Sequence, residues 1–338
     1  MRRRPRAKRP LEPREPDGTL RTVVVIGTTT VDLFLTGIER LPGAGADEFT
    51  PQNVAFLDQP PIMVLGGNAA NSAYVLAGLD TPTSLCSVIG RDTLGALVLD
   101  WLKQRGVVLD GMIQAESWAT SSTTVAIDRS LHRLSFHHRG GSPEFSPEEV
   151  PPELVSQARC LLLTSYHLLP KFRGRGGVEL LAQARRSGSL TGLDIGPAIP
   201  PVANLEELTP LLRHVDYLLG NVYEITACTR LPNLDEACSA LLAAGAGTVV
   251  VKRGSEGASA FTRTGRIDVA GFAVKTDFTV GAGDAFNAGF LHALLADGAV
   301  DRALRFANAV AALVVQAKNG VFGSPDAREV RAFLARHA

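Results

Sequence analysis

The chain has 338 residues, of which 45% are hydrophobic and 20% are charged. This composition can bury a large core, so it excludes a wholly disordered chain. The length indicates either two ordinary domains or one large α/β domain with an attachment. Four scattered cysteines without a CxxC pair argue against a disulfide scaffold and against a structural zinc site.

The 34 basic and 34 acidic residues balance, but they are unevenly placed. Residues 1–21 hold eight Lys and Arg against three acids, which leaves 26 against 31 in the remainder. Residues 1–20 are rich in Arg and Pro and show no apolar period, so they are predicted to be a disordered basic tail. The tail is either a solvated extension or a contact for nucleic acid or a membrane. We favour the extension, because the remainder offers too little basic surface for a nucleic-acid binder.

No apolar run approaches the ~18 residues that a membrane span needs. No charged-then-apolar signal peptide opens the chain. A cytoplasmic protein without a membrane partner is therefore expected.

After the tail, short apolar runs alternate with longer amphipathic stretches. The runs predict strands at residues 23–26, 84–89, 161–164, 190–193, 217–219 and 248–251. The amphipathic stretches predict helices at residues 68–79, 93–105, 178–187, 234–244, 287–295 and 302–316. This alternation predicts a mostly parallel sheet with helices on both faces, and ligands at the carboxyl ends of its strands.

Two regions interrupt this rhythm with strand-like alternation and few helix signals. Residues 47–65 and 107–136 are predicted to form a small β-sheet beside the main one, with a hairpin at 123–127 and 132–136. Such a sheet would cover a cleft as a lid within one domain of residues 21–338. Its exposed face would pair with a second copy of the chain, which predicts a possible homodimer.

The most informative stretch reads TVGAGDAF, from Thr279 to Phe286. Gly281 and Gly283 flank Ala282 and permit a backbone in which successive N–H groups point into one concavity at a helix N-terminus. Such a nest binds anions and is supported by the helix dipole. Asp284 falls in the first helical turn, where it is either an ordinary cap or a base that accepts a proton from a hydroxyl.

Several motifs together resemble the ribokinase-like (PfkB) carbohydrate kinase family. TVGAGDAFNAGF, beginning at Thr279, resembles the second family signature, and GGNAAN at residues 66–71 resembles the first. Residues 221–224 match an N-x-x-E motif, and residues 252–257 resemble a nucleotide-binding loop. The resemblance extends from about residue 22 to the C-terminus. It implies a three-layer α/β/α core with a small β-sheet lid, and an ATP-dependent kinase.

The resemblance assigns catalysis to the 281–284 stretch. Asp284 would take the proton from a primary hydroxyl, which then attacks the γ-phosphate of ATP. The N–H groups of Ala282, Gly283 and Asp284, in the turn that Gly281 opens, would stabilise charge on the transferring phosphoryl group. Such chemistry depends mainly on positioning and electrostatics.

The substrate residues implied by the resemblance follow the first strand and open the first helix. Asp32 would accept hydrogen bonds from substrate hydroxyls, since a carboxylate offers two acceptor oxygens; the alternative is a turn cap. Gly66 and Gly67 would allow close approach of the backbone, and Asn71, with Asn68 as a weaker candidate, would bind a hydroxyl. The alternative is a plain strand-to-helix turn with Asn caps.

Asn221 and Glu224 have the spacing of an N-cap and its capping-box Glu. By resemblance they hold Mg²⁺ through waters, because Mg²⁺ keeps several waters and one carboxylate can suffice. Both interpretations can hold together.

The other implied nucleotide contacts come from four separate segments. They are Lys252, Gly254, Gly257, Thr279 and Asn308. The family often has Thr where this chain has Lys252, although Lys can also reach a phosphate. Phe278 stands where the family usually has Asp, with Asp277 one place earlier, so the resemblance does not carry potassium activation over to this chain.

These residues predict phosphorylation of a primary hydroxyl on a sugar or sugar-like molecule. Two alternatives are open: a nucleoside kinase, and a catalytically idle sugar- or nucleotide-binding regulator. A nucleoside kinase needs an apolar shelf for the base, which Phe49, Phe56 and Phe136 could provide. The presence of both Asp284 and Glu224 argues against an idle regulator. Past predicted strands, His137, His138, Arg139, His167 and Lys171 are further candidates for substrate contact.

Overall fold

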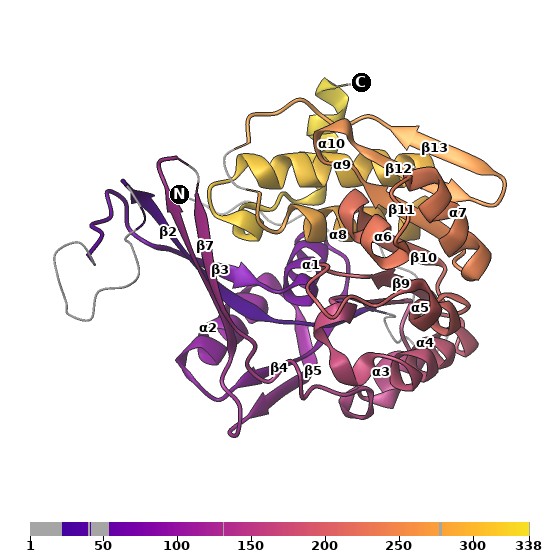
Figure 1. Cartoon of the computed structure of the whole chain (residues 1–338), viewed down its shortest axis with the longest axis horizontal. Helices are drawn as coiled ribbons and strands as arrows, with labels where there is room; N and C mark the ends of the chain where they lie inside the picture. Colours follow the sequence, from indigo (N-terminus) through magenta and orange to yellow (C-terminus); the bar gives the residue numbers. More distant parts are fainter. Residues whose placement is uncertain (1–21, 40, 42–53, 131, 277–278, 338) are drawn as a thin grey trace, which may run out of the picture.

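A nine-stranded sheet forms the centre of the molecule (Figure 1). The computed structural model describes residues 22–39, 41, 54–130, 132–276 and 279–337. The strand order is β13-β12-β11-β10-β9-β8-β1-β4-β5, parallel except for β12 and β13. The bounds are β1 (Val23–Ile26), β4 (Thr83–Gly90), β5 (Val108–Ala115), β8 (Cys160–Leu163), β9 (Leu190–Asp194), β10 (Tyr217–Asn221), β11 (Thr248–Lys252), β12 (Ala258–Thr262) and β13 (Gly265–Val269).

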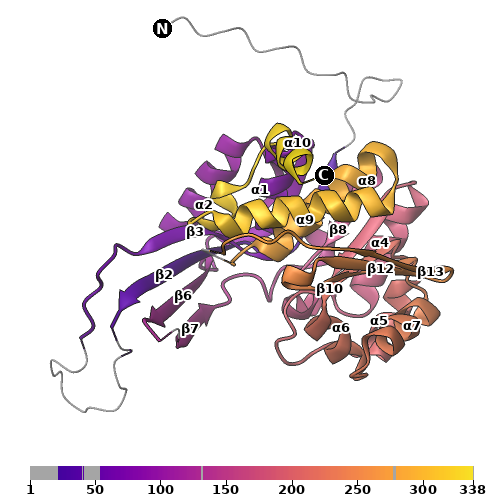
Figure 2. The same ribbon diagram turned by 90° about the horizontal axis from the view of Figure 1, so that it is seen from above.

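Helices cover both faces of this sheet, so the predicted three-layer core is confirmed (Figure 2). One layer contains α1 (Asn68–Gly78), α2 (Thr93–Arg105), α8 (Ala282–Asp297), α9 (Val300–Gln316) and α10 (Ala327–Arg336). The other contains α3 (Pro152–Ser156), α4 (Arg175–Arg186), α5 (Leu205–Leu212), α6 (Val222–Thr229) and α7 (Leu234–Ala244). The side chains of β1 alternate between the two faces of the sheet, which explains why both helix layers are needed. Val23 and Val25 pack against the first layer, and Val24 and Ile26 pack against the second.

A separate four-stranded sheet, called the lid sheet below, projects from the core in both views (Figures 1 and 2). Its order is β3 (Ile62–Gly66), β2 (Thr30–Ile38), β6 (Ser121–Asp128) and β7 (Arg133–His138). The pair β6–β7 is the predicted hairpin. β2 pairs antiparallel with β3 and parallel with β6. A small β-sheet beside the core was expected, and it is present.

The membership of the lid sheet differs from the prediction in two places. Residues 108–115 form β5, which pairs in parallel with β4 at the edge of the main sheet. An edge strand has exposed and buried positions in turn, so its sequence looks like that of a lid strand. Conversely, β2 was not predicted, although it lies at the centre of the lid sheet. The basic tail of residues 1–20 and part of the 47–65 segment lie outside the described residues.

None of the described helices is long and apolar enough to cross a membrane.

Candidate active site

Polar residues gather where neighbouring parallel strands end. Asp194, Asn221 and Lys252 are the last residues of β9, β10 and β11. Thr28 and Ser165 follow the adjacent strands β1 and β8. Because parallel strands end on the same edge of the sheet, these five side chains share one region. The first turn of α8 adds Asp284 to it.

Asp284 is buried and held by two amides of α1. Asn68 Nδ2 donates to its Oδ1 over 2.8 Å, and Asn71 Nδ2 donates to its Oδ2 over 2.9 Å. Two hydroxyl groups fix Asn68 in turn. Ser165 Oγ donates to Asn68 Oδ1 over 2.9 Å, and Ser165 Oγ lies 2.7 Å from Thr28 Oγ1. Each carboxylate oxygen therefore points in a defined direction.

The environment of Asp284 favours its protonated form more than water does. Burial, with a smaller contribution from the nearby charge of Asp194, raises the pKa of this carboxyl to about 7. The amides of Asn71 and Asn68 and the charge of Lys252 act in the opposite direction. A carboxyl with a pKa near neutrality can accept a proton during a reaction and release it afterwards.

The backbone before Asp284 adopts the turn predicted from its glycines. Gly281 is the N-cap of α8 with φ of 79°, and a Cβ there would lie 2.7 Å from Val321 Cγ1. Ala282 N–H donates to Thr279 O over 3.3 Å and closes the turn, so this amide, which was predicted to face the phosphoryl group, is already paired. The N–H groups of Gly283 and Asp284 occupy first-turn positions, where a helix supplies no internal acceptor. Two amides thus remain for an anion.

Lys252 lies beside this turn in a buried charge cluster. Its Nζ donates to Asp194 Oδ2 over 2.8 Å and to Asn287 Oδ1 over 3.3 Å. Asn287 Nδ2 also donates to Asp194 Oδ2, over 2.5 Å. Although burial opposes it, the charges of Asp194 and Glu224 raise the pKa of Lys252, so the ammonium stays charged. A Cβ on Gly283 would lie 3.6 Å from Nζ, which places a positive charge next to the two free amides.

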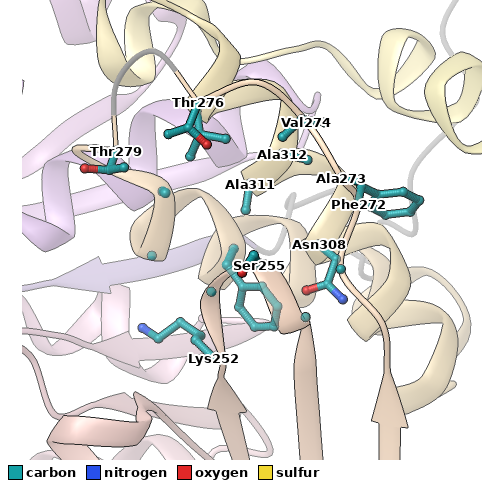
Figure 3. Close-up of a pocket in the computed structure, with 17 residues that line it drawn as sticks. Lys252, Ser255, Phe272, Ala273, Val274, Thr276, Thr279, Asn308, Ala311 and Ala312 are labelled. Atoms are coloured by element: carbon teal, nitrogen blue, oxygen red, sulfur yellow. The ribbon is translucent and has the colours of Figure 1, made fainter.

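A cavity of about 370 Å³ opens on one side of the turn (Figure 3). Figure 3 shows Lys252 and Thr279 toward one side of it and Phe272 and Asn308 toward the other. All five nucleotide contacts predicted outside the N-x-x-E motif line this cavity: Lys252, Gly254, Gly257, Thr279 and Asn308. Much of the remaining wall is apolar, from Phe272, Ala273, Val274, Phe286, Ala311, Ala312 and Val315. An apolar slot with a cation at one end suits a flat ring that carries phosphates.

Two of these residues also have structural duties. Asn308 Nδ2 donates to the carbonyl oxygens of Val269 and Ala270, so this side chain fixes the chain after β13. Gly257 has φ of 98°, and a Cβ there would lie 2.1 Å from Val269 O. The cavity wall therefore needs glycine at this point of the loop.

Asn221 and Glu224 form the predicted capping box of α6. Asn221 Oδ1 accepts from Glu224 N, and Glu224 Oε2 accepts from Asn221 N, each over 2.8 Å. Neither lines either of the two cavities described here. Burial raises the pKa of Glu224, while the charge of Lys252 lowers it. Among the described residues, no group of three His, Cys, Asp or Glu side chains could hold a metal by itself.

A second cavity, of about 400 Å³, lies between the core and the lid sheet. Asn68 lines this cavity and also donates to Asp284, whose neighbours Ala282 and Gly283 line the first cavity. Asp284 consequently stands between the two. The predicted residues Asp32, Gly67 and Asn68 line the second cavity, together with His137, Arg139 and His167.

Asp32 sits on β2, and Gly66 leaves room for it. Thr30 Oγ1 donates to Asp32 Oδ1 over 2.9 Å, and a Cβ on Gly66 would lie 2.3 Å from Asp32 Oδ2. Gly67 has φ of 84° and approaches the backbone of Thr28. Burial raises the pKa of Asp32, while hydrogen bonds from Thr30 and Thr123 lower it.

Some predicted residues lie elsewhere than expected. Asn71 does not line the second cavity. Its side-chain amide instead donates a hydrogen bond to Asp284 Oδ2. Phe56 and Phe136, proposed as a shelf for a nucleobase, do not line it either and are 86% and 64% exposed. Phe49 and Phe278 lie outside the described residues.

Two important residues had no signal in the sequence. Asp194 is a single acid after a strand, and its pairing with Lys252 joins residues 58 positions apart. Ser165 has φ of 57°, an uncommon value for a residue with a Cβ, and a Cβ on Gly196 would lie 2.7 Å from its Cα. The glycine pattern before Asp284, by contrast, was visible directly.

Curated proteins similar to this chain include two kinases. The ATP-dependent ribose-1-phosphate kinase of Halopiger xanaduensis is 32% identical over 80% of this chain and 86% of that protein. The nucleoside kinase of Methanothermobacter thermautotrophicus is 28% identical over 94% of this chain and 96% of that protein.

Solved structures and a family model agree with these relatives. Arabidopsis thaliana ribokinase, complexed with ribose and ATP, superposes with a TM-score of 0.79 at 25% identity, covering 94% of this chain and 99% of that one. A ribokinase from Thermotoga maritima gives the same TM-score at 23% identity, covering 94% and 100%. The model of the pfkB family carbohydrate kinases matches residues 21–327. The chain therefore belongs to the pfkB family of carbohydrate kinases.

Proposed function

We propose that the protein transfers the γ-phosphoryl group of ATP to a primary hydroxyl of a sugar or sugar-like molecule, with Asp284 as the general base. The observation that carries this proposal is the place of Asp284, a buried carboxylate between two cavities, with helix-terminal amides and Lys252 beside it.

The cavity beside Lys252 is suited to the nucleotide. Its apolar wall, including Phe272 and Val274, accepts the adenine ring, and the phosphates extend toward Lys252 and the amide of Gly283. The ATP named in the ribokinase complex of Arabidopsis supports ATP as the nucleotide. The acceptor sugar then occupies the cavity under the lid sheet, where Asp32 accepts hydrogen bonds from its hydroxyls.

The reaction has one proton and one phosphoryl group to move. The acceptor hydroxyl gives its proton to a carboxylate oxygen of Asp284 while its oxygen forms the new bond to the γ-phosphorus. The bond between that phosphorus and the bridging oxygen breaks, and ADP leaves with the electron pair. Lys252 and the amides of Gly283 and Asp284 stabilise the charge on the equatorial oxygens.

Mg²⁺ would supply further charge neutralisation on the phosphates. An ATP complex with Mg²⁺ exists for a structural relative, a putative ribokinase from E. coli. Glu224 fits an ion held through waters rather than directly, because one of its oxygens already closes the capping box. Asn221 and Glu224 are the residues that would hold this hydrated ion.

The test is the variant Asp284→Asn, assayed for ADP release and for ligand binding. A general base contributes about 10²–10⁴-fold, so the turnover should fall by this factor while ATP still binds. Near-normal turnover in the variant would refute the assigned role. Since Asn71 Oδ1 accepts no hydrogen bond from a described residue, Asn71 can turn its amide over and accept from the new side chain.

A further inference from the structure

Two buried polar atoms in the substrate cavity have no hydrogen-bond partner among the described residues. They are Nε2 of His167 and Oγ of Ser142, buried atoms of two residues that line this cavity. Each residue is only 5% exposed. An unpaired buried polar group is unfavourable, so groups of this kind in the wall of a cavity point to a ligand that pairs with them once it is bound.

The hydrogen bond at Nδ1 of His167 determines which ring nitrogen carries the proton. Ala203 N–H donates to Nδ1 over 3.2 Å, so Nδ1 carries no proton. Burial and the charge of Arg173 lower the pKa of His167 to about 4, which keeps the ring neutral. The proton is therefore on Nε2, and the unpaired atom is a donor.

The charged residues of the cavity wall differ in how far they are already paired. Arg173 donates to Glu207 over 2.7 and 2.5 Å and to Pro201 O over 2.6 Å, so it is neutralised and braces the wall. Arg139 is exposed and makes no ion pair within the described part of the chain. Arg139 is consequently the cation that this wall can offer to a ligand.

We infer that Arg139, His167 and Ser142 bind an anionic substituent, and that the acceptor is a sugar carrying a phosphate or carboxylate group. This inference rests on the proposed kinase function. A cation and a donor-only ring nitrogen match an acceptor-only anion, and the Ser142 hydroxyl can turn its proton toward the same group. The Asp32 carboxylate serves the hydroxyls of the same sugar.

The composition of the wall argues against a nucleobase as the recognised group. Among the described residues, no phenylalanine, tyrosine or tryptophan lines the cavity. Its apolar part comes from Leu168, Ile199 and the prolines at 170, 197, 200 and 201. A base would have no aromatic ring of these types to stack on.

The test uses the full chain and a panel of acceptors with Mg-ATP. The panel contains pentose 1-phosphates, keto-deoxy sugar acids, neutral pentoses and hexoses, and nucleosides. ADP release measures turnover. Titration calorimetry on the Asp284→Asn protein measures acceptor binding separately from catalysis. The phosphate and carboxylate arms identify which anion the site prefers.

The variants are Arg139→Gln, His167→Phe and the control Arg133→Gln. Arg133 lies on the same strand, β7, and does not line the cavity. We expect Arg139→Gln to raise KM for the anionic acceptor about 10–100-fold with kcat nearly unchanged, because a hydrogen bond to a charged group contributes about 1.5–3 kcal/mol. His167→Phe keeps the ring but removes the donor, and should also raise KM. If the melting temperature shows that His167→Phe does not fold, the comparison of Arg139→Gln with Arg133→Gln tests the inference.

The outcomes separate the two proposals. If a neutral sugar or a nucleoside is the best acceptor and Arg139→Gln does not change its KM, the anion inference is wrong and the kinase function stands. If anionic sugars bind through Arg139 but no acceptor in the panel is phosphorylated, the anion site stands and the proposed function is wrong.

Discussion

Asn71 donates a 2.9 Å hydrogen bond to Oδ2 of Asp284, and both side chains are almost fully buried. This contact stabilises the ionised form of a carboxyl whose pKa burial has raised to about 7. The availability of the base near neutral pH therefore depends on Asn71.

The first prediction concerns the pH profile of Asn71→Ala. The loss of one donor should raise the pKa of Asp284 further and move the acidic limb of kcat/KM upward by roughly one pH unit. The rate should recover in alkaline buffer, which a structural defect would not allow. Ser72→Ala is the matched control, because Ser72 Oγ contacts the backbone oxygen of Asp284 and not its carboxylate. An acidic limb that stays in place would contradict the role given to Asn71.

The second prediction concerns stability. The folded pKa of Asp284 is about 7 against an ordinary value of 3.8, so between about pH 4 and 7 the folded chain holds a proton that the unfolded chain has lost. Stability contributed by this group is present below pH 4 and is lost as the pH rises to 7. Asp284→Asn escapes this loss. Its melting temperature should exceed that of the wild type increasingly up to pH 7, by about 2 °C for each kcal/mol relieved. Equal melting temperatures across this range would argue against the raised pKa.

The third prediction concerns Lys252. Removal of one partner of a buried ion pair costs about 3–5 kcal/mol. Lys252→Met should therefore lower the melting temperature and raise KM for ATP. The double variant Lys252→Met, Asp194→Asn removes the unpaired charge, so it should regain stability without regaining affinity for ATP. Full recovery of ATP binding would show that Lys252 acts only as a structural partner.

The fourth prediction concerns metal dependence. Glu224→Gln retains an oxygen for the capping box, so α6 should remain folded. It loses the charge that would hold hydrated Mg²⁺, so the Mg²⁺ concentration for half-maximal activity should rise severalfold. The matched control is Glu329→Gln in the capping box of α10. An unchanged Mg²⁺ requirement would restrict Glu224 to capping.

The fifth prediction concerns assembly through the lid sheet. β7 is an edge strand whose residues are all exposed, including Leu134 and Phe136. Such an edge invites pairing with a second copy. Phe136→Glu should shift the mass measured by light scattering from dimer toward monomer. A wild-type monomer at all accessible concentrations would contradict the predicted homodimer.

The regular core was predictable because its patterns are local. Buried parallel strands such as Val23–Ile26 read as apolar runs, and α2 begins after Asp92, which accepts from Gly95 N, and ends at Gly106 in the left-handed region. The same local logic failed for β5, because an edge strand of the main sheet and a lid strand share one alternation. Which sheet a strand joins is decided by its partners, which the sequence does not display.

The site residues likewise fall into those that a local motif predicts and those that only folding brings together. The glycine turn before Asp284 and the capping box at Asn221 are short motifs, so they were visible. The Lys252–Asp194 pair and the Ser165–Asn68 bond join segments 58 and 97 residues apart, and only folding brings them together. The role of Asn71 needed the orientation of its amide, which a motif does not contain.

The hydroxyl chain from Thr28 through Ser165 to Asn68 has a consequence for how acceptor preference can change. Thr28 and Asn68 line the second cavity, and all three residues belong to the hydrogen-bond chain that holds Asp284, so an exchange among them would disturb both the cavity and the carboxylate. Among the described residues, Arg139 and the four prolines that line this cavity form no hydrogen bond with Thr28, Ser165 or Asn68. New acceptors should therefore be gained, in evolution or by engineering, through changes at Arg139 and these prolines, while Thr28, Ser165 and Asn68 stay constant.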